Sequence, residues 1–143
     1  LTIPDLPVEE NQEIFEIARK NDFKVVCFIA PTTTDQRVSL ITQKAQGFLY
    51  YISVVGITGI RDKLPDDIIQ NINKLKQMTN IPVAVGFGVS TSEHAKLIGT
   101  VADGVIVGSA IMREIEKYAK EPSEELVRGV GEFVGQLISG AKG

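Results

Sequence analysis

The sequence predicts an α/β fold built on a parallel sheet. Short apolar runs rich in β-branched residues alternate with longer amphipathic segments, which is typical of repeated strand-helix units. The chain has 143 residues, of which 43% are hydrophobic and 23% charged, as in an ordinary soluble domain. No linker or low-complexity stretch interrupts the pattern, so we expect residues 1–143 to form a single α/β unit.

Four apolar runs predict the strands. Each is nearly continuous, as expected of parallel strands that are covered on both faces. The predicted strands are Lys24–Ile29, Phe48–Ile52, Pro82–Val85 and Gly104–Val107. Two architectures fit strands that alternate with helices: an open doubly wound sheet, or part of a (β/α)8 barrel. A complete barrel usually needs about 250 residues, so length alone favours the open sheet.

The helices are predicted from apolar residues that recur every three or four positions. The predicted segments are Glu9–Lys20, Asp35–Ala45, Asp66–Met78 and Ser123–Ser139, with a further helix from about Thr91. Ser90 and Glu93 have the spacing of a capping box for that helix. Ser123 is the expected N-cap of the final helix, whose apolar stripe must cover another element, and 140–143 is an expected frayed tail.

Three glycine-bearing turns follow strands directly, at the edge where α/β proteins place ligands. They are Gly56–Gly59, Gly86–Ser90 and the Gly108-Ser109 pair. Backbone N–H groups at Gly108 and Ser109, the positive end of the following helix and the Ser109 hydroxyl suit a phosphate. Each glycine alone also fits helix capping, but glycines on two consecutive strand-helix units favour a phosphate site.

Charge and cysteine content exclude several classes of function. The net charge is −3 and the basic residues are scattered, which argues against nucleic-acid binding. No apolar stretch approaches the roughly 20 residues that span a membrane. The single Cys27 excludes internal disulfides and cysteine zinc sites, and we predict no metal site. It suits a reducing compartment such as the cytoplasm. The chain opens on apolar Leu1–Pro4, as if inside a strand, so we expect that it was cut from a longer protein.

Five motifs, in this order, resemble the alpha subunit of tryptophan synthase from end to end of the chain. They are Asp5–Pro7, Ala30–Thr33, Phe48–Ser53 leading to Gly56–Gly59, Val83–Ser90 and Ala102–Ile111. The resemblance implies a (β/α)8 TIM barrel of which this chain covers about the second half, from the end of the fourth strand to the eighth strand and the C-terminal helix.

The resemblance also implies a function. The family cleaves indole-3-glycerol phosphate to indole and glyceraldehyde 3-phosphate by a retro-aldol route without a cofactor, and passes indole to a pyridoxal-phosphate beta subunit. The residues implied to contact the phosphate are Gly59, Gly88, Gly108 and Ser109. Those implied to line the substrate pocket are Tyr50, Thr58, Phe87 and Ile106.

The catalytic Glu and Asp of the family lie on the first half of its barrel, outside this chain. Asp5 and Asp103 do not replace them, His94 is expected at the surface, and Cys27 is expected to be a buried hydrophobe. We therefore expect the 143-residue chain to bind phosphate and to be inactive alone.

Two alternatives remain: another barrel isomerase acting on sugar phosphates, and a noncatalytic phosphate-binding or subunit-docking module. Whatever the function, half a barrel has two open sheet edges. We expect the isolated chain to self-associate or to need its N-terminal complement.

Overall fold

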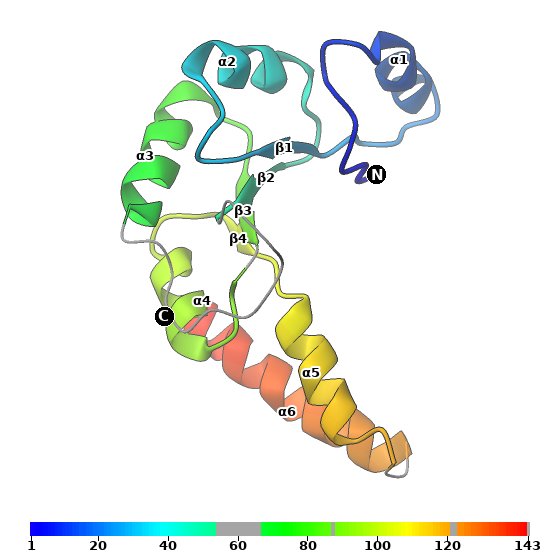
Figure 1. Ribbon diagram of the computed structural model, residues 1–143, viewed down its shortest axis with the longest axis vertical. Helices are drawn as coiled ribbons and strands as arrows, with labels where there is room; N and C mark the ends of the chain where they lie inside the picture. The colour runs from blue at the N-terminus through cyan, green and yellow to red at the C-terminus, as the bar shows by residue number, and fades with distance from the viewer. Residues whose placement is uncertain (54–66, 87, 121–122, 143) are drawn as a thin grey trace.

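The computed structural model describes residues 1–53, 67–86, 88–120 and 123–142. Four strands alternate with helices along this part of the chain, as the sequence predicts (Figure 1). The strands are β1 (Cys27–Ile29), β2 (Leu49–Ile52), β3 (Val83–Gly86) and β4 (Gly104–Val105). The helices are α1 (Gln12–Lys20), α2 (Asp35–Lys44), α3 (Ile68–Met78), α4 (Ser92–Gly99), α5 (Ser109–Lys117) and α6 (Ser123–Lys142).

The strands pair in parallel in the order β1-β2-β3-β4, which is also their order in the chain. Thr2 forms a parallel bridge with Val26, next to β1. In a doubly wound sheet the strand order reverses at a switch point, whereas in a barrel each strand pairs with the next along the chain. The open doubly wound alternative is therefore wrong, and the sheet is a segment of a (β/α)8 barrel.

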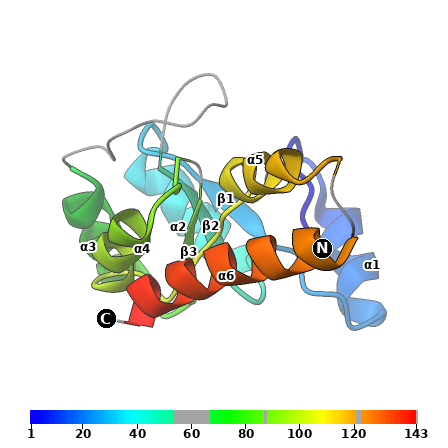
Figure 2. The same cartoon turned by 90° about the horizontal axis from the view of Figure 1, so that it is seen from below.

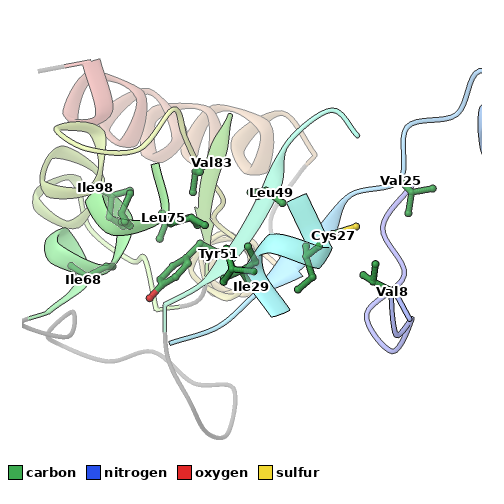
Figure 3. Close-up of a cluster of buried hydrophobic side chains, with 14 of the residues drawn as sticks. Val8, Val25, Cys27, Ile29, Leu49, Tyr51, Ile68, Leu75, Val83 and Ile98 are labelled. Atoms are coloured by element: carbon green, nitrogen blue, oxygen red, sulfur yellow. The ribbon is translucent and has the colours of Figure 1, made fainter. Parts of the chain in front are cut away.

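Helices cover one face of this sheet. Leu49, Tyr51, Val83 and Val85 point to that face and are at most 3% exposed, packed with α2, α3 and α4 (Figure 3). On the other face, Phe28, Tyr50 and Ala84 are only half-buried. The expectation that both faces are covered thus fails for the described residues. In a complete barrel this second face is the interior, filled by side chains from all eight strands.

Two helix starts differ from expectation. α1 begins at Gln12 rather than Glu9, after a turn in which the Asn11 side chain donates to the Pro7 carbonyl at 3.0 Å. The N-cap of α4 is Thr91, whose hydroxyl accepts from the His94 N–H at 3.2 Å. The capping box with Ser90 is therefore wrong by one residue.

The end of the chain is helical rather than frayed, because α6 continues to Lys142. Ser123 is the first residue of that helix rather than the residue before it. The apolar stripe of α6 packs against α4 and α5, as predicted, and Figure 2 shows α6 running along both. Gly140 lies against the Ser92 backbone and Gly99 against the Ala141 backbone, so these contacts hold the last turn in place.

None of the helices in the described ranges is long and apolar enough to cross a membrane.

Candidate functional site

The carboxyl ends of β3 and β4 lie side by side. Val85 pairs with Val105, and the Ile106 N–H donates to the Val85 carbonyl at 2.8 Å, which extends this pairing beyond β4. Gly88 follows the end of β3 and Gly108 follows the end of β4. Because the two strands are adjacent and parallel, both glycine turns lie at the same edge of the sheet. The structure thus brings together two of the three turns on which the predicted phosphate site depends.

The two glycines have different local roles. Gly88 has φ +82°, a left-handed conformation that favours glycine. Gly108 has φ −119°, which other residues adopt readily, and a Cβ built there meets nothing within 4 Å. Open space therefore borders the Gly108 backbone, so a ligand atom has room to approach it.

Gly108 and Ser109 form the start of α5. The Gly108 carbonyl accepts from the N–H groups of Ile111 and Met112 at 2.9 and 3.1 Å, which closes the first turn. The first N–H groups of a helix have no acceptor within it and carry its positive partial charge. Ser109 is exposed, and the first turn of α5 contains no acidic side chain that would offset this charge. The arrangement is suited to an anion.

Tyr50 and Ile106, two of the predicted pocket residues, lie next to this edge. Tyr50 is on the face of β2 that the helices leave uncovered, with its ring 5.0 Å from that of Phe28. A Cβ at Gly86 would lie 2.6 Å from the Tyr50 Cζ, so only glycine fits beside the phenol ring. Burial raises the pKa of Tyr50, which keeps its hydroxyl protonated. Ile106 is half-buried.

Three of the predicted site residues lie outside the described part of the chain: Thr58, Gly59 and Phe87. Their roles remain predictions that rest on the family resemblance.

Three side chains that the sequence analysis excluded as catalytic residues are Cys27, Asp103 and His94, and their surroundings agree with that exclusion. Cys27 is buried, as predicted, and burial raises its pKa to about 11, so it is a poor nucleophile at neutral pH. Asp103 lies at the amino end of β4, at the opposite edge of the sheet from Gly108. His94 is half-buried rather than fully at the surface, with Nδ1 3.5 Å from the Ser90 hydroxyl. The described residues contain no cluster of three or more His, Cys, Asp or Glu side chains able to hold a metal ion.

A hollow of about 470 Å³ lies between the N-terminal segment and the end of β1. It is lined by Asp5–Pro7, by Ala30 and Thr33, and by Arg37, which pairs with Glu9 at 3.1 Å. Two motifs that are far apart in the sequence therefore meet in space. Arg37 was missed by sequence analysis, because nothing in its local pattern distinguishes it from other basic residues on a helix surface.

Comparisons with known proteins agree with this geometry. A family model described as "Tryptophan synthase alpha chain" matches residues 1–141. The tryptophan synthase alpha chain of Chloroflexus aurantiacus is 40% identical over 137 residues, which cover 96% of this chain and 50% of the relative. That of Methanocaldococcus jannaschii is 41% identical over 121 residues, which cover 85% of this chain and 43% of the relative.

Solved structures give the same result. The crystal structure of the tryptophan synthase alpha chain from Legionella pneumophila is similar with a TM-score of 0.82 at 30% identity, over 99% of this chain and 51% of that one. The tryptophan synthase a2b2 complex from Pyrococcus furiosus contains a chain similar with a TM-score of 0.77 at 38% identity, over 94% and 54% of the two chains. The chain spans about half the length of the relatives that it matches.

Proposed function

Because the chain belongs to the tryptophan synthase alpha chain family, we propose that it forms the phosphate-binding half of a carbon-carbon lyase. The complete enzyme would cleave indole-3-glycerol phosphate to indole and glyceraldehyde 3-phosphate. The observation that carries this proposal is the meeting of the Gly88 turn and the α5 N-terminus at one edge of the sheet.

The substrate phosphate would bind at the start of α5. A dianion there accepts hydrogen bonds from the N–H groups of the first turn and from the Ser109 hydroxyl, and the open space beside Gly108 admits its oxygens. The Gly88 turn would form another side of the phosphate site. The family resemblance implies that Gly59 also contacts the phosphate. The indole end would lie toward Tyr50 and Ile106 on the uncovered face of the sheet, with Phe87 and Thr58 as further pocket residues.

This half of the enzyme would hold the substrate but not cleave it. Retro-aldol cleavage needs an acid to protonate the indole ring and a base to accept the hydroxyl proton, each worth about 10² to 10⁴ in rate. The resemblance assigns these roles to a Glu and an Asp outside the chain. The phosphate site anchors an unreactive part of the substrate, which keeps the reacting carbons in position. No cofactor takes part in the proposed reaction. We propose the cytoplasm as the place where the enzyme acts.

We also propose a tryptophan synthase beta subunit as the partner. Support comes from the Pyrococcus furiosus relative, whose structure is that of a tryptophan synthase a2b2 complex. The exposed Asp5 and the hollow beside it are the part of this chain that we expect at the contact.

Calorimetric titration with indole-propanol phosphate tests the phosphate site. Ser109→Asp places a carboxylate at the proposed anion position, so like-charge repulsion should lower the affinity at least tenfold. Ser123→Asp is the matched control, because Ser123 is also an exposed first residue of a helix but lies far along the chain from the glycine turns. It should leave the affinity unchanged.

Two results would contradict the proposal: undiminished affinity in Ser109→Asp, or equal losses in both variants. Inorganic phosphate and a sugar phosphate, titrated in parallel, separate the remaining alternatives. Tighter binding of the indole ligand supports the lyase, whereas equal binding of all three ligands supports a noncatalytic phosphate-binding module.

A further inference from the structure

The Tyr51 side chain carries a polar group into the apolar core. Tyr51 is 3% exposed and lies on the helix-covered face of β2, opposite to the face that carries Tyr50. In Figure 3 its ring extends away from the strand, and the hydroxyl oxygen lies at the end nearer Ile68, the first residue of α3.

This hydroxyl is buried, and no group of the described residues meets it in good hydrogen-bond geometry, although the Asn71 side chain lies close enough to act on it. Burial raises the pKa of Tyr51 to about 12, the Asp67 carboxylate adds to the rise, and the nearby Asn71 amide opposes it. The group is therefore a neutral O–H donor at any physiological pH. Buried polar atoms in folded proteins are almost always hydrogen-bonded to protein or to ordered water, because a lost hydrogen bond is costly away from solvent.

A small cavity of about 70 Å³ lies beside Tyr51, between α2 and α3. Its polar lining comes from Thr33, Asp35, Asn71 and Lys74, and the rest of it is apolar. The Lys74 ammonium donates to both Asp35 carboxylate oxygens, at 2.6 and 2.9 Å. The Asn71 amide donates to the Asp67 carboxylate at 2.9 Å, which leaves the Asn71 amide oxygen as an acceptor.

We propose that this cavity is a binding site for ordered water, which accepts the Tyr51 O–H and donates to polar groups of α2 and α3. The cavity is large enough for water, and its lining, with Asp35 and Lys74 at the exposed side, offers the two to four partners that an ordered water needs. A metal cation is disfavoured because the Lys74 ammonium already lies at the Asp35 carboxylate. The cavity is too small for an aromatic ligand. The bound water would tie β2 to both neighbouring helices.

The site is independent of the proposed function, because it lies on the other face of the sheet from Tyr50 and includes none of the phosphate-site residues. The two proposals therefore fail or succeed separately.

A crystal structure that resolves ordered solvent tests the proposal directly. We expect a water oxygen roughly 2.5–3.0 Å from the Tyr51 hydroxyl and in contact with α2 or α3. In Tyr51→Phe this water should be lost or displaced. Tyr118→Phe, which removes a half-buried hydroxyl beside α6, is the matched control and should retain it.

Urea unfolding gives a second readout with opposite signs for the two cases. If water satisfies the hydroxyl, Tyr51→Phe should lower the equilibrium constant for folding by roughly five- to tenfold. If the cavity is dry, removing an unsatisfied hydroxyl should leave that constant unchanged or raise it. A dry cavity, or a direct hydrogen bond from Tyr51 to Asn71 with no water between them, would overturn the proposal.

Discussion

At the scale of single residues, Asp103 joins three elements through one carboxylate. Its Oδ2 accepts from the Val83 N–H at 2.8 Å, and its Oδ1 accepts from the Lys76 ammonium at 2.8 Å. It thereby connects the amino ends of β3 and β4 to α3. The hydrogen bond from Lys76 is the largest of the effects that hold the pKa of Asp103 below its usual value, followed by that from Val83.

These contacts predict a pH-dependent contribution to stability. Because the folded pKa is depressed, the contribution is complete above the unfolded pKa, about 3.9, and is lost as the pH falls through the folded value. Asp103→Asn should lower the free energy of unfolding by about 0.5–1 kcal/mol at pH 7, since the pair with Lys76 is partly exposed. Urea unfolding of Asp103→Asn and of the unsubstituted chain measures this difference in the free energy of unfolding. The difference should be present at pH 7 and should disappear near pH 2.

Asp22→Asn is the control for this prediction. Asp22 pairs with Lys24 at 3.0 Å, but its side chain is 94% exposed, so its loss should change stability little at either pH. Asn also tolerates the left-handed φ of +56° at this position. An Asp103→Asn effect of the same size at both pH values would contradict the electrostatic explanation.

The two site glycines predict separable effects on stability and binding. Gly88→Ala forces a Cβ onto a left-handed residue and should destabilise the protein by about 1 kcal/mol. Gly108→Ala meets no protein atom, so it should leave stability nearly unchanged while it narrows the space for a phosphate ligand. Thermal unfolding and titration with indole-propanol phosphate measure the two quantities. Unchanged affinity in Gly108→Ala would argue against a phosphate at the start of α5.

At the scale of elements, α6 depends on close packing against α4. A Cβ at Gly140 would be 3.1 Å from the Ser92 Cα and closer still to its carbonyl, so the helices must separate to admit it. Gly140→Ala should lower the free energy of unfolding by about 1–3 kcal/mol, although alanine favours helix. Hydrogen exchange should also accelerate in the last turn of α6.

Gly135→Ala tests this prediction on the same helix. A Cβ at Gly135 meets nothing within 4 Å, so only helix propensity changes, and stability should rise by about 0.5–1 kcal/mol. If both variants shift unfolding in the same direction, packing against α4 is not what fixes the end of the helix.

The sequence predicted the strands and helices well where the signal is local. Runs such as Leu49–Ile52 and the 3.6-residue period of α3 carry their own pattern. The end of α6 was mispredicted because the last turn packs against α4, where Gly140 lies beside Ser92, 48 residues away in sequence, and such a contact leaves no local signal. Two features depend on how the elements meet in space. One is the strand order. The other is the choice between Tyr50 and Tyr51 as a pocket or core residue, which depends on which face of the sheet the helices cover. Residue patterns alone did not settle the strand order, which the family resemblance predicted, and the role of Tyr50 as a pocket residue stays a prediction that rests on that resemblance.

The candidate site also contains residues that a local pattern predicts and residues that it does not. Gly108 and Ser109 were recognisable because a strand followed by Gly-Ser and a helix is a local phosphate-binding pattern. That they share an edge with Gly88 was predicted because both turns directly follow strands, whereas the pairing of β3 with β4 is seen only in the structure. The roles of Thr58, Gly59 and Phe87 rest on resemblance alone.

At the scale of the whole molecule, two apolar surfaces are left partly uncovered in the described part of the chain. The face of the sheet with Phe28 and Tyr50 is half-exposed, and an apolar hollow of about 430 Å³ lies beside β4, lined by Ile106, Leu137 and Ile138. Ile138 is 48% exposed. Exposed apolar surface favours association.

We expect the isolated 143-residue chain to self-associate, and to release indole only when an N-terminal half is supplied. Sedimentation measures the first property. The second requires mixing with the separately expressed N-terminal half of a full-length relative such as that of Chloroflexus aurantiacus, with Ser109→Asp as the control. A well-folded monomer that gains no activity in the mixture would contradict both expectations.

The sequential strand order has a consequence for how the protein is made. Each strand hydrogen-bonds to the strand that follows it, so a nascent chain leaving the ribosome meets a ready template for every new unit. Paired residues of neighbouring strands are 20 to 34 positions apart, so each pairing closes a shorter loop than pairing with a more distant strand would. In the described part of the chain, α6 returns to contact α4, so this contact can form only after α6 itself has been synthesised.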